Sequence, residues 1–390
     1  MSGMMIELEK KDLLSLIGKT QNIVEKRNTM PVLINVLLEA KDGLLKVFAT
    51  DLEVSLTDQV PTLKEKAGKV AVSAKSLFEI VKELDDGPVT LTKRENNWLE
   101  IKQKKSVFNI VGIAAEEYPV FPSYATKDFM TIGASLFADM IEKTIYSVSN
   151  DETRYYLNGV FFERLPAKDK DGPSVFRMVA TDGFRLSVVD REIKLPDAQK
   201  QSAFPATGVI IPRKGLFEIR KMLETIDGDF DLAVEGSQLV VRQGSTVLMV
   251  RLIEGKFPSY QQFIPQSVPN RVQIPRDALL SCLKRVSLLS NQKYKGITLA
   301  LTGGPAGGSA GGRMEISSNN PELGDAKEEL EVEYKGGDIK IGFNARYMLD
   351  VLNSFDDEGV DLHLNDQLSP GLMRPQHDAS YTCVVMPMRI

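Results

Sequence analysis

The sequence is poor in the residues on which metal and redox chemistry usually depends. Its 390 residues include two cysteines, two histidines and one tryptophan. Cys282 and Cys383 lie far apart and outside any C-x-x-C spacing, so we interpret them as small buried thiols in a reducing compartment. His363 and His377 are too few to build a histidine-based triad or a metal site of histidines and cysteines. We therefore expect no catalytic residues, no metal and no cofactor.

Long apolar runs and an excess of positive charge are also missing. No stretch approaches the ~18 apolar residues of a membrane span, and Met1–Leu8 has no signal-peptide core, so we expect a cytoplasmic protein. Lys and Arg number 48 against 53 Asp and Glu, which gives a net charge of −5. This balance excludes a globally basic nucleic-acid binder but allows a basic patch on an acidic body.

An internal repeat is the most informative feature that is present. Two sets of three segments each open with an apolar–polar alternation and continue as an amphipathic helix. They begin at Met5, Met130 and Val272 in the first set and at Gly68, Thr207 and Gly337 in the second. The marker FPSY also occurs twice, at 121–124 and 257–260. The spacing predicts three units of roughly 120–140 residues, which we place at 1–125, 126–265 and 266–390.

Each unit is predicted to combine two helices with several antiparallel strands. Leu216, Ile219 and Leu223 fall on one helical stripe, whereas runs such as Trp98–Lys102 and Gln238–Arg242 alternate with period two. The first helix is expected over Lys10–Lys26. The pattern indicates an α+β class with helices on one face of antiparallel sheets. The segments 167–174 and 303–312 are rich in Gly or charge and are interpreted as surface loops.

Basic residues concentrate in the predicted helices, whereas the rest of the chain is net acidic. A solvated face would explain any single helix. Repetition of the pattern in all three units favours attraction to phosphate instead, and no helix-turn-helix signature is present to read bases. The contributing residues are Lys10, Lys11, Lys19, Lys26, Arg213, Lys214, Arg220, Lys221, Arg276, Lys284 and Arg285.

Acidic neighbours provide no convincing catalytic centre. Asp85–Asp86 and Asp356–Glu358 follow predicted helices at turn-like positions without a histidine partner. The Asp-Gly of ATDGFRL (180–186) fits a tight turn in which Gly supplies a positive φ. We favour a protein without catalysis, and the alternative is a metal-dependent nucleic-acid enzyme that uses turn carboxylates on an α+β scaffold.

Several long motifs resemble those of the bacterial DNA sliding clamp family, the beta subunits of DNA polymerase III, over the whole chain. They are TMPVLINVLLEA (29–40), ATDLEVSL (49–56), RYYLNGVFFE (154–163), ATDGFRL (180–186), IPRKGLFEI (211–219), FPSYQQFIP (257–265), GFNARYMLDVLN (342–353) and VVMPMRI (384–390). The resemblance implies three sliding-clamp domains per protomer and a head-to-tail homodimer that closes as a ring. Such a ring encircles duplex DNA without sequence readout, and an ATP-driven clamp loader places it there. It is a non-catalytic, nucleoid-associated tether for the replicative polymerase.

The resemblance also implies DNA contacts. Arg27 matches a DNA-contacting position of the family. Tyr155 follows Asp151 and is expected to reach DNA, with core packing as the alternative. Asp151 stands where some relatives carry Gln, and its carboxylate would repel phosphate. With the helical cations, the expected DNA-binding set is Arg27, Lys10, Lys11, Lys19, Lys26, Tyr155, Arg213, Lys214, Arg220, Lys221, Lys284 and Arg285.

A hydrophobic cleft for partner peptides is implied between the second and third domains. Its positions match Leu157, Thr181, Gly183, Phe184, Arg185, Leu186, Pro258, Phe263, Val384, Val385, Met386, Pro387, Met388 and Arg389. An apolar chain end with two flexible thioethers suits an adaptable wall, whereas a last core strand is the alternative for Val384 and Val385. Phe184 and Gln262 depart from the usual His and Arg. The implied ligand is a short motif with a Gln and a terminal hydrophobic pair, carried by replicative, repair and translesion polymerases and by clamp-loader subunits.

For the contact between protomers, the resemblance points to apolar pairs flanked by opposite charge. One side is Phe108 and Ile110 with Lys75 nearby. The other side comprises Leu288, Leu289, Glu322, Asp325, Glu328 and Glu329. A heterologous interface of this kind closes into a ring and covers exposed strand edges.

Overall fold

The structure, a computed structural model, describes residues 3–24, 30–125, 128–166, 173–195, 204–265, 269–303 and 311–389. The chain forms two compact units. The first comprises Met1–Ser135, Leu195–Phe204 and Lys214–Leu252, and the second comprises Leu136–Lys194, Pro205–Arg213 and Ile253–Ile390. Most of the two predicted loops, namely 167–172 and 304–310, lies outside the described residues.

A nine-stranded antiparallel sheet forms the centre of the first unit. Its order is β10 (Gly112–Ile113), β6 (Gly68–Ser73), β2 (Asn35–Lys41), β3 (Leu44–Thr50), β4 (Val54–Pro61), β18 (Thr246–Arg251), β17 (Gln238–Gln243), β16 (Asp229–Glu235) and β11 (Met130–Gly133). β4 pairs with β18, so that Leu56 lies opposite Leu248. The first and second repeats thus share one continuous sheet.

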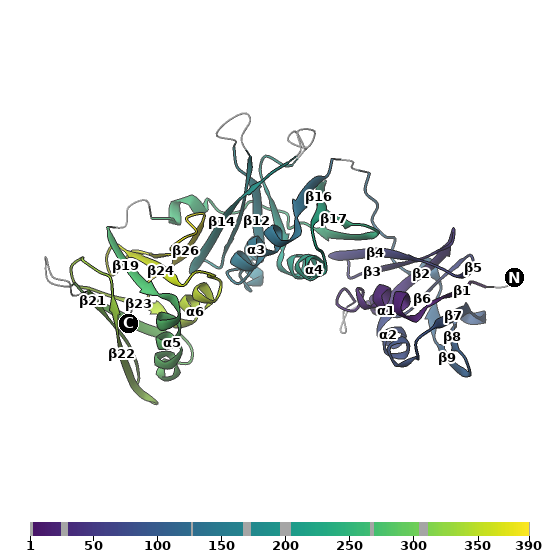
Figure 1. Cartoon of the computed structure of the whole chain (residues 1–390), viewed down its shortest axis with the longest axis horizontal. Coiled ribbons are helices and arrows are strands. Elements are labelled where there is room, and N and C mark those ends of the chain that lie inside the picture. The colour runs from purple at the N-terminus through teal and green to yellow at the C-terminus, as the bar shows by residue number, and fades with distance from the viewer. Residues whose placement is uncertain are drawn as a thin grey trace. The chain divides into compact units, whose positions relative to one another are not determined.

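A smaller five-stranded sheet and three helices complete the first unit. The sheet order is β5 (Lys64–Lys66), β1 (Met5–Glu9), β7 (Pro88–Lys93), β8 (Leu99–Gln103) and β9 (Ser106–Ile110). The helices are α1 (Lys10–Gly18), α2 (Ala74–Glu83) and α4 (Arg213–Leu223), which joins this unit from Lys214 onward. α1 and α2 pack side by side (Figure 1). The predicted stripe of α4 is confirmed, because Leu216, Ile219 and Leu223 are buried.

The first helix is shorter than predicted, because it ends at Gly18 and not at Lys26. Thr20 donates its hydroxyl to the carbonyl of Ile17 at 2.7 Å, and its amide bonds the same oxygen at 3.1 Å. This local side-chain bond competes with the helical ladder and turns the chain. On α4, Gly215 allows close approach to β18, since a Cβ there would lie 2.3 Å from Cγ1 of Val250.

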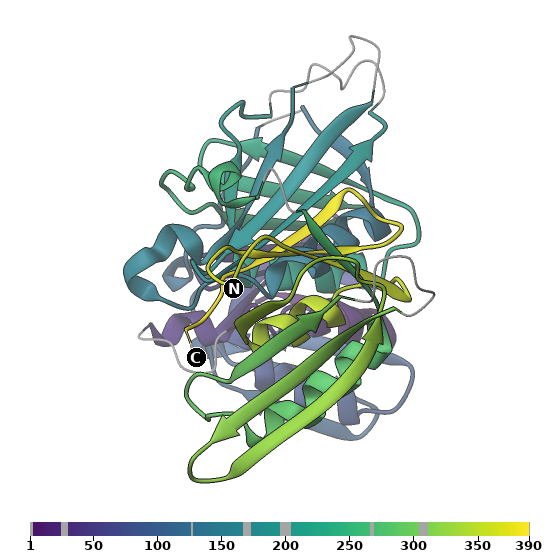
Figure 2. The ribbon, with the colours of Figure 1, turned by 90° about the vertical axis from the view of Figure 1, so that its left-hand side faces the viewer.

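The second unit also contains one large and one small antiparallel sheet. The eight-stranded sheet has the order β15 (Val209–Pro212), β12 (Gly159–Arg164), β13 (Ser174–Thr181), β14 (Arg185–Ile193), β26 (Tyr381–Val385), β25 (Gly371–Pro375), β24 (Gly359–Leu364) and β19 (Asn270–Pro275). The four-stranded sheet has the order β22 (Gly324–Val332), β21 (Gly312–Asn320), β20 (Gly296–Thr302) and β23 (Ile339–Asn344). Figure 2 shows β21 and β22, in light green, as a long hairpin.

Helices α3 (Ala134–Ile145), α5 (Arg276–Val286) and α6 (Ala345–Asn353) belong to the second unit, α3 from Leu136 onward. α5 and α6 pack side by side, as α1 and α2 do in the first unit. Short 3-10 turns connect the elements: η1 (Pro31–Ile34), η2 (Glu95–Asn97), η3 (Ala115–Glu117), η4 (Glu152–Leu157), η6 (Tyr260–Phe263) and η7 (Ser287–Leu289). The α+β class is confirmed, with paired helices beside antiparallel sheets in each unit.

Candidate functional site

The predicted cleft residues gather in the second unit where β14 meets β26. Leu186 lies opposite Val384 in the ladder. Beyond β26, the amide of Met386 donates to the carbonyl of Phe184 at 2.9 Å, and the amide of Met388 donates to that of Gly342 at 2.8 Å. The segment after β26 is therefore bonded to both sheets of the unit and does not hang free.

The apolar part of the cleft rests on a buried cluster. Its members are Leu157, Val179, Leu186, Val188, Ile210, Phe257, Tyr260 and Val384. Val384 and Val385 are buried, which supports the core-strand alternative for these two, whereas Met386, Pro387 and Met388 are half-buried. Phe263 is 46% exposed at the end of η6. Exposed apolar surface beside a buried apolar floor is what a hydrophobic peptide side chain needs.

A tight turn presents Phe184 to solvent. Gly183 has φ of 91°, as the Asp-Gly pair predicted. The hydroxyl of Thr181 accepts from the amide of Gly183 at 3.0 Å and donates to the carbonyl of Arg185 at 2.6 Å. Asp182 accepts from the amides of Phe184 and Arg185 at 2.9 and 3.1 Å. Because these hydrogen bonds stabilise the turn, we interpret Asp182 as a turn residue and not as a catalytic acid.

The side chain of Arg185 is 9% exposed, and each nitrogen of its guanidinium donates a hydrogen bond. Its guanidinium donates to Asp182 at 3.0 Å, to Asp350 of α6 at 2.6 Å and to the carbonyl of Tyr146 at 2.6 Å. The ring of Tyr347, also on α6, lies 4.5 Å from it. The sequence prediction named Arg185 but missed Asp350 and Tyr347, since nothing in the local sequence reveals that α6 packs against β14.

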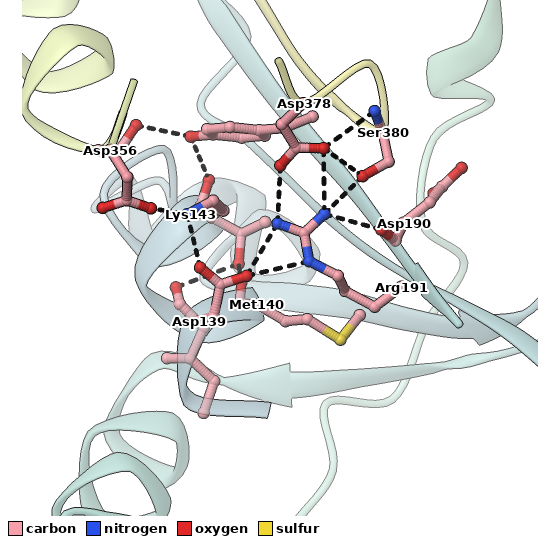
Figure 3. A network of polar contacts seen from close by, with 12 residues as sticks. Asp139, Met140, Lys143, Asp190, Arg191, Asp356, Asp378 and Ser380 are labelled. Carbon is pink, nitrogen blue, oxygen red and sulfur yellow. Dashed lines mark hydrogen bonds and ion pairs between the residues drawn. The ribbon is translucent and has the colours of Figure 1, made fainter. Parts of the chain in front are cut away.

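A second polar network lies on α3, β14 and the turn before β26 (Figure 3). Lys143 contacts Asp139 at 2.5 Å and Asp356 at 2.7 Å. Arg191 contacts Asp139 at 2.9 Å and Asp378 at 2.8 Å. Burial alone would lower the pKa of Lys143, but its two carboxylate partners outweigh burial and raise that pKa.

Among the described residues, three ion pairs link the second repeat to the third: Arg185–Asp350, Lys143–Asp356 and Arg191–Asp378. In each pair the cation comes from the second repeat and the carboxylate from the third. Paired charges in partly buried positions lose much if one partner is removed. These pairs thus fix the strands that carry the cleft.

Cys383 is buried in the same seam, and its thiol lies 3.2 Å from the Tyr146 hydroxyl. Burial raises the pKa of Cys383 to about 11, so the thiol stays protonated at neutral pH. Cys282 is buried as well. The interpretation of both cysteines as buried thiols is confirmed.

Two of the predicted cleft residues, Met388 and Arg389, also line a hollow of about 450 Å³. It is lined by Thr298, Lys340, Ile341, Gly342, Gln367, Leu368, Met388 and Arg389. Only Met388 and Arg389 were predicted. The others come from β20, β23 and the loop before β25, and the pairing of β20 with β23 places Thr298 opposite Gly342.

The helical cations divide into exposed and engaged groups. Lys11, Lys221 and Lys284 are exposed. The engaged group pairs as follows: Lys10 with the Leu84 carbonyl, Lys19 with Asp58, Lys214 with Asp51, Arg213 with Asn150, Arg220 with Glu224, and Arg285 with Glu328. Lys26 and Arg27 lie outside the described residues. Part of the positive charge counted in the sequence is thus neutralised within the chain.

Asp151 is a capping residue. It accepts from the amide of Thr153 at 3.0 Å and from Arg154 at 2.9 Å, and these bonds, led by those from Thr153, lower the pKa of the Asp151 carboxyl. The Asp151 carboxylate, close to Tyr155 in the sequence, therefore stays ionised and is paired with Arg154. Tyr155 itself is 56% exposed, which favours an accessible ring over core packing.

The residues predicted at the protomer contact lie at two sheet edges. β9, with exposed Phe108 and half-buried Ile110, ends the five-stranded sheet of the first unit. β22 ends the four-stranded sheet of the second unit, and Leu288, in η7, is 71% exposed. The remaining predicted residues are Lys75 (paired with Glu79), half-buried Leu289, exposed Glu322 and Asp325, Glu328 (paired with Arg285), and Glu329 (paired with Arg313).

Within the described residues, no three His, Cys, Asp or Glu side chains cluster as they would around a metal ion. Nothing in the described structure thus supports the metal-dependent alternative. None of the helices in the described ranges is long and apolar enough to cross a membrane.

Three family models match the chain in succession. They describe the N-terminal, central and C-terminal domains of the DNA polymerase III beta subunit and match residues 4–122, 131–259 and 261–389. The beta sliding clamp of Caulobacter vibrioides is 32% identical over 389 residues, which cover 99% of this chain and 100% of that protein. The beta sliding clamp of Escherichia coli is 30% identical over 388 residues, with the same coverage.

Solved structures agree with these matches. The crystal structure of the Caulobacter crescentus beta sliding clamp has a TM-score of 0.89 at 32% identity. That of a sliding clamp from Bartonella birtlesii bound to griselimycin has a TM-score of 0.90 at 31% identity. Both comparisons cover 99% of this chain and 100% of the other.

Proposed function

The chain belongs to the DNA polymerase III beta-subunit family, the sliding clamps of DNA replication, and from this membership we propose that two copies close head to tail as a ring around duplex DNA. Attachment then comes from enclosure, because the ring can slide but leaves only when an interface opens. The clamp has no catalytic role of its own in this proposal and serves as a tether for polymerases.

One observation carries the proposal for the ring. Two strands, β9 and β22, lie at sheet edges in different units, and apolar side chains are exposed on or beside each of them. β9 has unpaired backbone groups on its outer side and the exposed ring of Phe108, so another strand can pair with it. Acidic side chains lie on the other edge strand, β22, near Leu288. Since the two surfaces differ, a head-to-tail contact joins them, and two such contacts between two copies cover β9 and β22 in both.

DNA is expected to be held by weak, sequence-independent contacts. The exposed ammonium groups of Lys11, Lys221 and Lys284 support attraction to phosphates. The exposed ring of Tyr155 supports a further contact. Such contacts are screened by salt, so they would not stop the ring from sliding.

The cleft around β14 and β26 is proposed to bind the short motif of polymerases, clamp-loader subunits and repair proteins. The exposed ring of Phe263 and the half-buried Met386 support a hydrophobic anchor site. The ion pairs of Arg185 and Arg191 support a rigid floor, which reduces the ordering cost of binding.

Loading onto circular DNA tests the proposal. Clamp is loaded on a nicked plasmid by a clamp loader with ATP, and the bound fraction is isolated by gel filtration. Retention is expected on the circle, with release after the plasmid is cut once. Equal retention on circular and linear DNA would contradict enclosure and indicate direct grip.

A further inference from the structure

β23 presents a free edge next to the cleft. It is the last strand of the four-stranded sheet, and on its outer side the described structure places one isolated bridge, between Gly342 and Met388. In an antiparallel strand, residues two apart direct their backbone groups to the same side. The N–H and C=O of Lys340 therefore face the same outer edge as those of Gly342.

The hollow described above lies on this edge and continues the cleft. Met388 contributes both to the predicted cleft and to the hollow. Gly342 is buried and its carbonyl already accepts from the amide of Met388, so an incoming peptide would meet this edge at the exposed Lys340. Leu368, at 67% exposure, provides an apolar wall on the opposite side. An extended peptide leaving the cleft past Met388 would enter this space.

The hollow carries an uncompensated positive charge. The side chains of Lys340 and Arg389 are exposed and form no ion pair or hydrogen bond with any residue that the structure describes. Asp366, in the loop before β25, accepts instead from the amides of Leu368 and Ser369, both at 2.8 Å. Asp366 is not among the residues that line the hollow, and the lining contains two cations and no carboxylate.

We propose that Lys340 and Arg389 form an accessory subsite for acidic side chains that flank the partner motif. This inference rests on the peptide cleft of the proposed function. The terminal hydrophobic pair of the motif fits the buried cluster around Leu157 and Val384. The part of the peptide that reaches Met388 is then the part preceding the Gln, and there a Glu or Asp meets two unpaired cations.

Two labelled peptides test this subsite by fluorescence anisotropy. Both contain Gln-Leu-Ser-Leu-Phe, preceded by Glu-Glu in one and Gln-Gln in the other. Two exposed ion pairs predict roughly threefold to tenfold tighter binding of the acidic peptide at low salt, with the difference falling as salt rises. The double variant Lys340→Gln, Arg389→Gln should bind both peptides alike, because the preference for the acidic peptide is lost with the two cations.

The control variant Lys335→Gln removes an exposed lysine of the same unit that does not line the hollow, and it should keep the preference. Equal binding of the two peptides by the unmodified clamp would overturn the subsite while leaving the cleft intact. A preference that survives in the double variant would also overturn it. Failure of both peptides to bind would overturn the cleft assignment and the subsite with it.

Discussion

Arg185 on β14 and Asp350 on α6 are joined at 2.6 Å, with the guanidinium stacked on Tyr347. This pair connects the turn that presents Phe184 with a helix of the third repeat. Because Arg185 is nearly buried, its charge depends on Asp350 and Asp182 for compensation. The pair therefore ties the segment that carries Phe184 to the third repeat, and we expect it to contribute to the stability of the second unit.

Replacing Asp350 by Asn should destabilise the second unit by about 1–3 kcal/mol, because a nearly buried guanidinium loses one of its two carboxylates. A melting temperature lower by several degrees is expected in calorimetry. The exposed Asp227→Asn in the first unit is the control and should melt like the unmodified protein. An unchanged melting temperature for Asp350→Asn would mean that Asp182 alone compensates Arg185.

A charge at Phe263 should abolish binding of the Gln-containing peptide. Phe263→Asp places a carboxylate in an exposed apolar wall, so the fold should persist while the anchor site is lost. Met386→Asp should act in the same way. Val120→Asp is the matched control, since it charges an exposed apolar residue of the first unit away from the cleft. Unchanged affinity of Phe263→Asp in an anisotropy titration would refute the cleft assignment.

Removing the exposed helical charges should shorten the residence of loaded rings, most at low salt, and should weaken the dependence of residence on salt. The triple variant Lys11→Gln, Lys221→Gln, Lys284→Gln avoids cations that the chain already pairs internally. Each lost phosphate contact lowers the salt slope by about 0.9. The triple variant Lys102→Gln, Lys105→Gln, Lys335→Gln, which changes exposed lysines outside the helices, should behave as the unmodified clamp. If both triple variants show one salt dependence, these helices do not face DNA.

Acid should destabilise the second unit through Asp378. Burial raises the pKa of this carboxyl, but Ser380 and Arg191 outweigh it and lower the pKa below the ordinary 3.8. A lowered pKa in the folded state means that its stabilisation is present above pH 3.8 and is lost as the pH falls through the folded value. Asp378→Asn should make the melting temperature fall less steeply with pH in a series that runs from above pH 3.8 to well below it. An equally steep acid limb in the variant would assign the effect to other carboxylates.

A charge at Leu288 should prevent ring closure. Leu288→Asp changes a largely exposed side chain, so the fold should persist and the mass in solution should fall from twice 43.3 kDa to 43.3 kDa. Leu368→Asp is a control, because this exposed leucine lies at the hollow and away from the predicted contact. A dimeric Leu288→Asp would contradict the assignment of η7 to the interface.

Sequence periodicity predicted much of the fold, because burial of a helical stripe such as Leu216, Ile219 and Leu223 is a local property. The end of the first helix was mispredicted because one hydroxyl, that of Thr20, turns the chain within an otherwise amphipathic pattern. The turn at Gly183 was predictable from its Asp-Gly pair.

Long-range contacts were not predictable in this way. Asp350, Tyr347 and Lys340 lie far along the chain from the cleft residues beside them, and only the pairing of strands and helices joins them. Charge counting also overstated the cationic surface, since Lys19, Lys214 and Arg285 are neutralised by carboxylates from other elements.

The two backbone bonds that hold Met386 and Met388 leave Pro387 between them, at a position where a missing N–H costs nothing. Because these two hydrogen bonds anchor the backbone of the segment, we expect a ligand to bind against it without displacing it.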